Sequence, residues 1–259
     1  MGLKFCSFSS GSSGNCYMVK TETTTLLVDV GISAKRIMDA MKNTGTEKEN
    51  LRGILLTHEH WDHIRGLRVL LKRISNLPVF ANSSTWEAIG EVEHLKEKRI
   101  FQTGEKFIVG DIEIKAFHTY HDAAEPVGYS FLCDGRKLSI VTDTGKISKN
   151  IIEEIFDADT IVIEANHEEE LLLIGRYPYY LKRRILSDQG HLSNKAAIEV
   201  LKDLVNKGDK DKQILFAHLS KENNFPEMVI ENVKEAFPEE EGFTMDILRR
   251  DTVSCIYLV

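Results

Sequence analysis

The stretch LLTHEHWDHIRGL, residues 55–67, limits the folds open to this chain more than any other segment. It places three histidines, a glutamate and an aspartate within positions 58–63. The apolar residues 53–56 that precede this cluster predict a buried strand. Apolar residues recur at helical spacing after it, at Ile64, Leu67, Leu70 and Leu71. The cluster therefore lies in the loop between a buried strand and an amphipathic helix.

The residue types in this loop suit divalent metal binding. Imidazole nitrogens and carboxylate oxygens together are ligands for Zn²⁺, Mn²⁺ or iron. The spacing aims His58 and His60 at one ion, and Asp62 and His63 at a neighbouring ion. The alternative is a polar turn in which Asp62 caps the following helix. Three histidines and an aspartate in so short a loop favour the metal site over the turn.

Further candidate ligands stand at or just beyond the ends of predicted strands. They are Asp29, His118, His121, Asp143 and His218. A single aspartate at a strand end is more often the cap of a turn than a metal ligand. Loops at one edge of a sheet, however, are where sites are commonly built. The joint pattern therefore predicts that these residues meet the histidine cluster at such an edge.

The order of the expected elements indicates an α/β protein with two sheets. Strands dominate residues 1–31 and 100–142, and each run is followed by alternating helices and buried strands. We expect helices at 33–42 with Ser33 as cap, 64–75, 84–91 with Ser84 as cap, 148–156, 193–207 and 226–236. The 259 residues, 42% of them hydrophobic, suffice for a substantial core. Two sheets packed face to face, with helices outside, satisfy this pattern.

Composition narrows the class of protein and its compartment. The net charge of −7 argues against a surface coated with positive charge for non-specific nucleic-acid binding. Disulfides stay open, but the four cysteines form no CxxC pair, and we expect unpaired buried thiols in a reducing compartment. Neither a signal peptide nor an apolar run of about 20 residues is visible. These features predict a soluble cytoplasmic protein that does not associate with membranes.

The motif THEHWDH, residues 57–63, resembles the HxHxDH motif of the metallo-β-lactamase fold superfamily. Asp29, His121, Asp143 and His218 occupy, in order, the positions of that superfamily's other motifs. The resemblance covers nearly the whole chain and implies a single domain over residues 1–259. It also implies a four-layer αββα sandwich with a dinuclear metal site at the edge of the two sheets.

The same resemblance implies a ligand set. The ligands expected for the first ion are His58, His60 and His121. Those expected for the second ion are Asp62, His63 and His218. Asp143 is expected to bridge the ions, and Asp29 to orient ligand histidines by hydrogen bonds. His118 competes with His121, but HDAAEPVGY, residues 121–129, is similar to the superfamily's H…P..GY pattern and favours His121. The expected cofactors are two divalent ions, Zn or Mn, with Fe as a further option.

Two other stretches resemble the ribonuclease Z-like branch of the superfamily. They are TIVIEANHEEE, residues 160–170, and GHLSNKAAIEVL, residues 190–201. In that branch a strand-end glutamate and a histidine before a helix assist proton transfer near the leaving group, and Glu164 and His191 match these places. With Asp62, they are the expected catalytic residues. Alternatively, His191 only precedes a helix capped by Ser193, and His167 is a weaker candidate in the same region.

Residues 175–185, GRYPYYLKRRI, combine basic and aromatic side chains. Basic groups contact phosphates, and aromatic rings stack on unpaired bases. The residues expected to bind nucleic acid are Arg176, Tyr177, Lys182, Arg183 and Arg184. The alternative is an amphipathic surface helix that carries a solvated run of charge. The position of the segment between Glu164 and His191 favours the nucleic-acid function.

The chain as a whole resembles the WalJ/YycJ-type group of bacterial metallo-β-lactamase-fold proteins. The stretches that carry this resemblance are residues 8–19, 57–67, 121–131, 163–172, 175–194 and 216–224. That group is associated with 5′-to-3′ DNA exonuclease activity and DNA mismatch repair, which implies DNA as the substrate and repair proteins as partners. The alternatives are a ribonuclease of the same chemistry and a non-catalytic or regulatory metal-binding protein. The turn SSGSSGN, residues 9–15, either lines the cleft or is a flexible hairpin.

Overall fold

Two seven-stranded mixed sheets face each other in the computed structural model, which describes residues 2–207, 211–238 and 242–259. The first sheet has the order β14-β1-β2-β3-β4-β5-β6, and the second has the order β13-β12-β11-β10-β9-β8-β7. The strands of the first sheet are β1 (Lys4–Ser9), β2 (Cys16–Lys20), β3 (Thr25–Val28), β4 (Leu51–Leu55), β5 (Val79–Ala81), β6 (Lys98–Ile100) and β14 (Tyr257–Leu258). Those of the second sheet are β7 (Lys106–Val109), β8 (Ile112–His118), β9 (Val127–Cys133), β10 (Arg136–Val141), β11 (Thr160–Glu164), β12 (Lys212–Ala217) and β13 (Phe243–Ile247).

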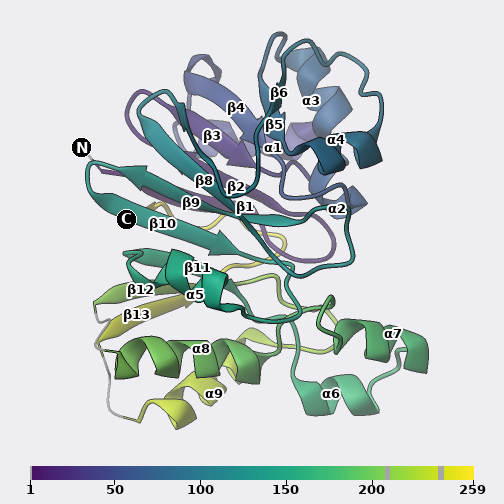
Figure 1. Ribbon diagram of the computed structural model, residues 1–259, viewed down its shortest axis with the longest axis vertical. Coiled ribbons are helices and arrows are strands. Elements are labelled where there is room, and N and C mark those ends of the chain that lie inside the picture. The colour runs from purple at the N-terminus through teal and green to yellow at the C-terminus, as the bar shows by residue number, and fades with distance from the viewer. Residues whose placement is uncertain (1, 208–210, 239–241) are drawn as a thin grey trace.

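Helices cover the outer faces of both sheets (Figure 1). Those beside the first sheet are α1 (Ala34–Asn43), α2 (Trp61–Ile64), α3 (Leu67–Arg73) and α4 (Ser83–Ile89), with a short 3₁₀ helix, η1 (Lys48–Asn50), before β4. Those beside the second sheet are α5 (Lys149–Phe156), α8 (Asn194–Asn206) and α9 (Pro226–Ala236). Two short helices extend beyond one end of that sheet, α6 (Glu169–Ile174) and α7 (Tyr179–Ile185). The predicted αββα sandwich is confirmed.

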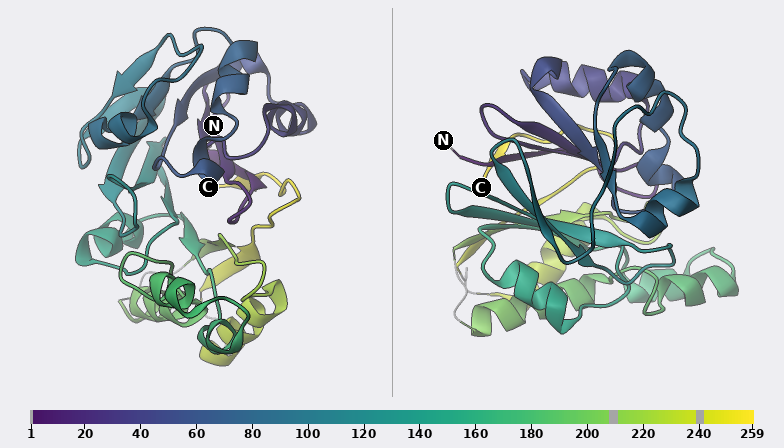
Figure 2. Two further views of the ribbon diagram at one scale, coloured as in Figure 1. Left: turned by 90° about the vertical axis from the view of Figure 1, so that its right-hand side faces the viewer. Right: turned by 45° about the horizontal axis from the view of Figure 1, so that its top comes forward.

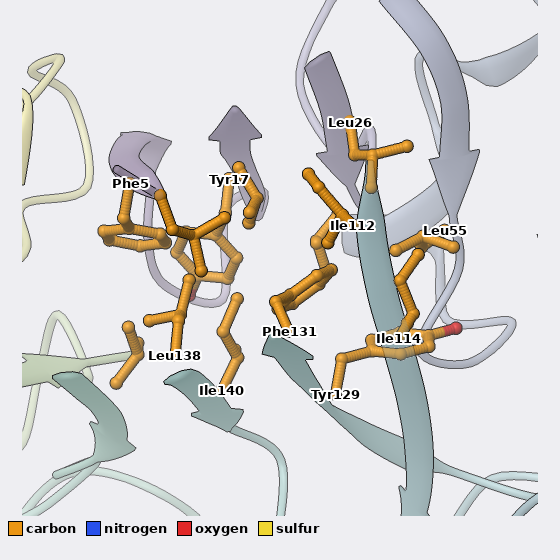
Figure 3. Packing of buried hydrophobic residues seen from close by; sticks show 14 of the residues in the cluster. Phe5, Tyr17, Leu26, Leu55, Ile112, Ile114, Tyr129, Phe131, Leu138 and Ile140 are labelled. Carbon is orange, nitrogen blue, oxygen red and sulfur yellow. The ribbon is translucent and has the colours of Figure 1, made fainter. Parts of the chain in front are cut away.

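The main core lies between the sheets, where side chains from facing strands interdigitate (Figure 3). Phe5, Tyr17 and Leu26 come from the first sheet and are fully buried. Ile112 and Phe131 approach them from the second sheet. Two further apolar clusters lie on the outer faces, under the helices. Strands that are buried on both faces appear in a sequence as continuous apolar runs, which is why the runs of this chain predict them.

The helix expected at residues 64–75 is wrong in its start and in its continuity. The chain forms α2 from Trp61 and begins α3 at Leu67, with a break at Gly66. The backbone of Gly66 packs so closely that a Cβ there would lie 2.2 Å from Ile32 O. This close approach requires glycine at position 66. The helical spacing of the apolar residues continues across this position, so the spacing does not reveal that the helix is interrupted there.

The cap expected at Ser84 is also wrong. The helix begins at Ser83 and its N-cap is Asn82, whose side chain accepts a hydrogen bond from Thr85 N at 2.8 Å. The Ser84 hydroxyl instead donates to a carboxylate oxygen of Glu125 at 2.7 Å. Asparagine and serine are about equally good caps, so two such candidates in neighbouring positions cannot be separated from the sequence alone.

Two other sequence predictions concern cysteines and membranes. All four cysteines are unpaired; Cys6, Cys16 and Cys133 are buried as expected, whereas Cys255 is exposed. Cys255 lies just before β14, a two-residue strand at the edge of the first sheet, so its apolar neighbours do not enclose it. Within the described parts of the chain, no helix has the length and apolar character to cross a bilayer.

Candidate metal centre

The candidate ligands stand where strands of both sheets end at one edge of the sandwich. Asp29 follows β3, His58 follows β4, Asp143 follows β10 and His218 follows β12. Asp29, Asp143 and His218 have φ values of 58°, 54° and 57°, in the left-handed region that non-glycine residues rarely adopt. Such backbone strain costs about 1–3 kcal/mol per residue and is concentrated at functional sites. The helices α2 and α7 lie on this side of the molecule (Figure 1).

The first group of ligand atoms belongs to His58, His60 and His121, and these atoms lie within 4.8 Å of one another. His58 Nε2 is 3.1 Å from His60 Nδ1. The second nitrogens of His58 and His121 are engaged elsewhere, since His58 Nδ1 is 2.9 Å from Thr57 Oγ1 and His121 Nδ1 is 3.0 Å from Gly190 O. Burial lowers the pKa of His58 and of His121, so both rings are neutral. A neutral imidazole offers the lone pair that a metal ligand needs.

The second group belongs to Asp62, His63 and His218. His63 Nδ1 lies 2.7 Å from Asp29 Oδ2, and its Nε2 lies 3.6 Å from Asp62 Oδ2. His218 Nδ1 lies 2.9 Å from Glu164 Oε1. Asp29 and Glu164 each hold a proton on the Nδ1 of their histidine, which directs Nε2 towards the group.

These carboxylates make His63 and His218 basic. Burial by itself lowers the pKa of both rings, but neighbouring charges outweigh it. Asp29 and Asp143 raise the pKa of His63 to about 10. Asp143 and Glu164 raise the pKa of His218 to about 9. Both rings are therefore protonated at neutral pH in the chain alone, and a cation bound at Nε2 displaces the second proton.

Asp143 lies between the two groups. Its Oδ2 is 3.5 Å from His63 Nε2, and its Oδ1 is 3.8 Å from His121 Nε2. Burial raises the pKa of Asp143, but the surrounding histidines, His218 foremost, hold it well below its ordinary value. Asp143 Oδ2 and His218 Nε2 are nevertheless buried without a hydrogen-bond partner. Buried polar atoms are almost always paired, so these two atoms and the converging donors around them fit bound divalent cations.

Glu164 and His191 form a pair at the edge of the ligand groups. Glu164 is fully buried, and its Oε1 lies 2.7 Å from His191 Nδ1. The side chain of His191 remains 19% exposed, so its ring is accessible from solvent. Burial raises the pKa of Glu164, but His191 and His218 outweigh it and hold that pKa below its ordinary value. The ligand atoms of Asp143, Glu164, His191 and His218 also lie within 4.8 Å, so this geometry also permits His191 to ligate a cation.

Sequence comparison identifies the superfamily. The family described as Beta-lactamase superfamily domain matches residues 24–218. The chain belongs to the metallo-β-lactamase superfamily. It is 43% identical over 249 residues to exodeoxyribonuclease YycJ of Bacillus anthracis, covering 94% of this chain and 92% of that protein. It is 40% identical over 233 residues to exodeoxyribonuclease WalJ of Streptococcus pneumoniae, covering 88% of this chain and 86% of that protein. The predicted resemblance to the WalJ/YycJ-type group is confirmed.

Solved structures of other superfamily members share the fold. The metallo-β-lactamase fold protein YhfI from Bacillus subtilis superposes with a TM-score of 0.74 at 16% identity, covering 100% of both chains. The short form of human tRNase Z superposes with a TM-score of 0.64 at 16% identity, covering 97% of this chain and 98% of that one. At these identities the likeness concerns the fold alone.

Two candidate histidines from the sequence, His118 and His167, lie outside the ligand groups found in the described part of the chain. His118 is exposed at the end of β8. His167 is buried, and burial lowers its pKa to about 4, so its ring is neutral. Ser193 caps α8 by accepting a hydrogen bond from Ala196 N at 3.2 Å, as predicted. His191 therefore both precedes a capped helix and lies beside the ligand groups, so the two interpretations do not exclude each other.

Asn15 and Thr57 support the ligand residues from the first sheet. Thr57 N and Oγ1 both donate to the Asp29 carboxylate, at 2.9 and 2.8 Å. Asn15 is fully buried, its Nδ2 lies 3.0 Å from His63 Nε2, and its backbone N–H donates to Asp62 O at 2.8 Å. The base of the SSGSSGN turn is therefore packed against the ligand loop, unlike a flexible hairpin. In the sequence, only its position directly before the histidine motif points to this role of Thr57.

The predicted nucleic-acid segment forms α7 and the loop before it, beyond one end of the second sheet (Figure 1). Its exposed basic residues are Arg176, Arg183 and Arg184. Arg184 forms an ion pair with Asp122, whose Oδ1 lies 3.5 Å from His121 Nε2. Lys182 Nζ donates to a backbone carbonyl at 2.7 Å, and Tyr177 is half-buried. The segment is thus a surface helix, as the alternative expected, and it also stands beside the site.

Proposed function

We propose that this protein is a metal-dependent exodeoxyribonuclease that hydrolyses phosphodiester bonds of DNA. The observation that carries the proposal is the His191–Glu164 pair beside two converging groups of ligand atoms. The names of the relatives YycJ and WalJ support DNA as the substrate. The finer expectations that go with this proposal are 5′-to-3′ polarity, a cytoplasmic location and repair proteins as partners.

The two groups divide the proposed ligands between two ions. We assign the first ion to His58, His60 and His121, and the second to Asp62, His63 and His218, with Asp143 between them. Both sheets supply ligands, which supports treating residues 1–259 as one domain. When bound, two divalent ions supply Lewis-acid stabilisation of the negative charge on the phosphate and activation of the attacking water. Zn and Mn suit this mixed nitrogen and oxygen donor set, and Fe is a further option.

His191 is the proposed proton donor to the leaving oxygen. Its Nδ1 bonds to Glu164 Oε1, which leaves Nε2 for the substrate. The Glu164 carboxylate, fully buried beside the ring, fixes the orientation of the imidazole by this hydrogen bond. A positioned histidine of this kind contributes about 10²–10⁴-fold to a rate by proton transfer. Asp29 plays the corresponding part for His63, where it fixes the ring of a ligand.

The DNA strand is proposed to pass between α7 and α2. The residues proposed to contact it from the α7 side are Arg176, Tyr177, Lys182, Arg183 and Arg184. Trp61, which lies within the ligand motif itself, is 68% exposed, and Tyr179 and Tyr180 are 75% and 74% exposed. Large aromatic rings exposed beside a site stack on unpaired bases whatever their sequence. The pairing of Arg184 with Asp122 makes it the least available of the five to a phosphate.

The test is a metal-supplemented assay on 5′- and 3′-labelled DNA, single- and double-stranded, with matched RNA. We expect release of nucleotides from the 5′ end of DNA and no comparable cleavage of RNA. A preference for RNA would favour the ribonuclease, and no turnover of any nucleic acid in metal-replete protein would favour the non-catalytic alternative. The control is His118→Ala against His60→Ala, because His118 lies outside the ligand groups and its loss is expected to leave activity intact.

A further inference from the structure

A pocket of about 330 Å³ lies beside the second ligand group. Four parts of the chain line it: the base of the SSGSSGN turn at Ser10, the segment after β12 at 219–221, the residues around the start of α9, Asn224 and Pro226, and the end of β13 with the segment after it at 247–252. The yellow C-terminal segment lies beside the purple N-terminal turn in Figure 2. The volume of the pocket is at the lower end of the range for pockets that bind small molecules, about 300–1,000 Å³.

The pocket is positively charged in a chain whose net charge is −7. Lys221, Arg249 and Arg250 line it, against a single carboxylate, that of Asp251. Lys221 and Arg249 are exposed, and neither forms an ion pair within the residues that the structure describes. Cations without a carboxylate partner at a concave surface concentrate the field there and attract anions.

Arg250 is held in place at the wall of the pocket. Its guanidinium donates to Leu219 O at 2.8 Å. Its backbone carbonyl accepts from Ser9 Oγ at 2.6 Å. Arg250 therefore joins the N-terminal turn to the segment that follows β12, and the cation needs little reordering when a ligand binds.

The pocket adjoins the ligand groups directly. Ser10 lines it, and the Ser10 hydroxyl accepts a hydrogen bond from His218 N at 2.8 Å. Leu219, the residue after His218, lines it as well. One wall of the pocket is thus formed by a residue that hydrogen-bonds to His218, a proposed metal ligand, and by the residue that directly follows it.

We propose that this pocket binds the terminal phosphate of a DNA strand. A phosphate monoester carries about −1.5 to −2 charge at pH 7, more than the single charge of an internal phosphodiester. A pocket with three cations and one carboxylate therefore favours a strand end over the middle of a strand. This inference rests on the proposed nuclease function and explains how the site selects ends; under 5′-to-3′ polarity, the bound group is the 5′-phosphate.

The test measures binding apart from hydrolysis. Metal-loaded protein is titrated into internally fluorescent single-stranded oligonucleotides that carry a 5′-phosphate, a 3′-phosphate or only hydroxyl ends. Phosphorothioate linkages near the ends slow their cleavage. We expect the 5′-phosphate to tighten binding on the order of tenfold, as one or two charge-assisted contacts provide.

The variant Lys221→Gln/Arg249→Gln is expected to abolish this preference, whereas Arg249→Lys retains most of it because the charge remains. The matched control, Lys72→Gln/Arg73→Gln, removes two exposed charges from α3, away from the pocket, and should keep the preference. Melting temperature and metal content verify that each variant is folded. Equal affinity for all ends, or a preference that survives in the Lys221/Arg249 double variant, would overturn the proposal.

The experiment distinguishes failure of the phosphate-binding proposal from failure of the proposed nuclease function. If no DNA is hydrolysed but the end preference exists and disappears in the double variant, the nuclease proposal fails while the pocket stands. If DNA is hydrolysed from its ends without any effect of the terminal phosphate, the pocket fails while the nuclease stands. A preference for the 3′-phosphate that the double variant loses supports the pocket and reverses the proposed polarity.

Discussion

Glu164→Gln tests whether one buried carboxylate holds the proton-transfer and metal-binding halves of the site together. Glu164 is fully buried and accepts from four donors. Its Oε1 meets His191 Nδ1 at 2.7 Å and His218 Nδ1 at 2.9 Å. Its Oε2 meets Thr144 N at 3.0 Å and Leu192 N at 3.3 Å. A carboxylate satisfies all four donors because both of its oxygens accept.

Glutamine cannot reproduce this arrangement, because its amide has one oxygen and one donating nitrogen. If the nitrogen faces Thr144 and Leu192, two buried backbone N–H groups lose their acceptor. Each buried donor without a partner costs about 1–3 kcal/mol, so the free energy of unfolding falls by about 2–6 kcal/mol. If the nitrogen faces the histidines instead, His218 and His191 must accept at Nδ1, and His218 then carries its proton on Nε2. That tautomer cannot ligate a cation, so this orientation lowers metal affinity instead.

The measurement combines urea unfolding of metal-free protein, metal content per chain and kcat on DNA. We expect the variant to have a lower free energy of unfolding, a lower metal content per chain, or both. In either case we expect kcat on DNA to fall. Glu169→Gln is the matched control, since Glu169 is half-buried and accepts one bond, from Ser193 Oγ at 2.9 Å, which the amide oxygen of glutamine can still accept. The reasoning would be refuted if Glu164→Gln lowered the free energy of unfolding by less than about 1 kcal/mol, kept the full metal content and retained kcat.

His191→Ala should lower kcat on DNA by about 10²–10⁴-fold with metal content unchanged, and should spare a nitrophenyl phosphodiester whose leaving group needs no proton. Loss of an ion in that variant would instead make His191 a ligand, as the grouping with Asp143 permits. His58→Ala/His60→Ala should hold fewer than two ions per chain by elemental analysis, and full occupancy would contradict the ligand assignment. Arg183→Gln should weaken DNA binding for all sequences and reduce the slope of log affinity against log salt by about one; an unchanged slope would separate α7 from the DNA.

Most of the fold follows from local sequence signals. Buried strands between turn residues appear as apolar runs, and the cap at Ser33 is confirmed by its bond from Arg36 N. The short strand β6 was missed, because its three residues are exposed and carry no apolar alternation. The helix α6 was missed as well, since Leu173 and Ile174 are exposed and give it no clear buried face. Local patterns fail where an element depends on its neighbours rather than on its own burial.

The site divides in the same way. The candidate ligands that the structure brings together carry side chains of obvious chemistry, either near strand ends or, for Asp62 and His63, in α2 after the histidine loop, and this is visible in the sequence. The contacts of Asn15 with Asp62, and of Ser10 with Arg249, join residues far apart along the chain. These contacts use groups that any polar turn contains, and their partners depend on how the N-terminal turn packs in the fold. The charged pocket could not be predicted from the sequence, because its cations come from separate segments with no shared motif.

The three left-handed strand ends link metal binding to the stability of the fold. Hydrogen bonds offset the strain at two of them: Asp29 accepts both donors of Thr57, and His218 N donates to Ser10 Oγ. Asp143 has no such offset at Oδ2, which is buried without a hydrogen bond. Its φ of 54° therefore places a charged oxygen where only the neighbouring histidines stabilise it. A cation bound there would compensate both the strain and the unpaired oxygen, and ligand binding of this kind adds directly to the free energy of unfolding. The backbone conformation that costs the metal-free chain stability is thus the conformation that positions Asp143 between the two ligand groups.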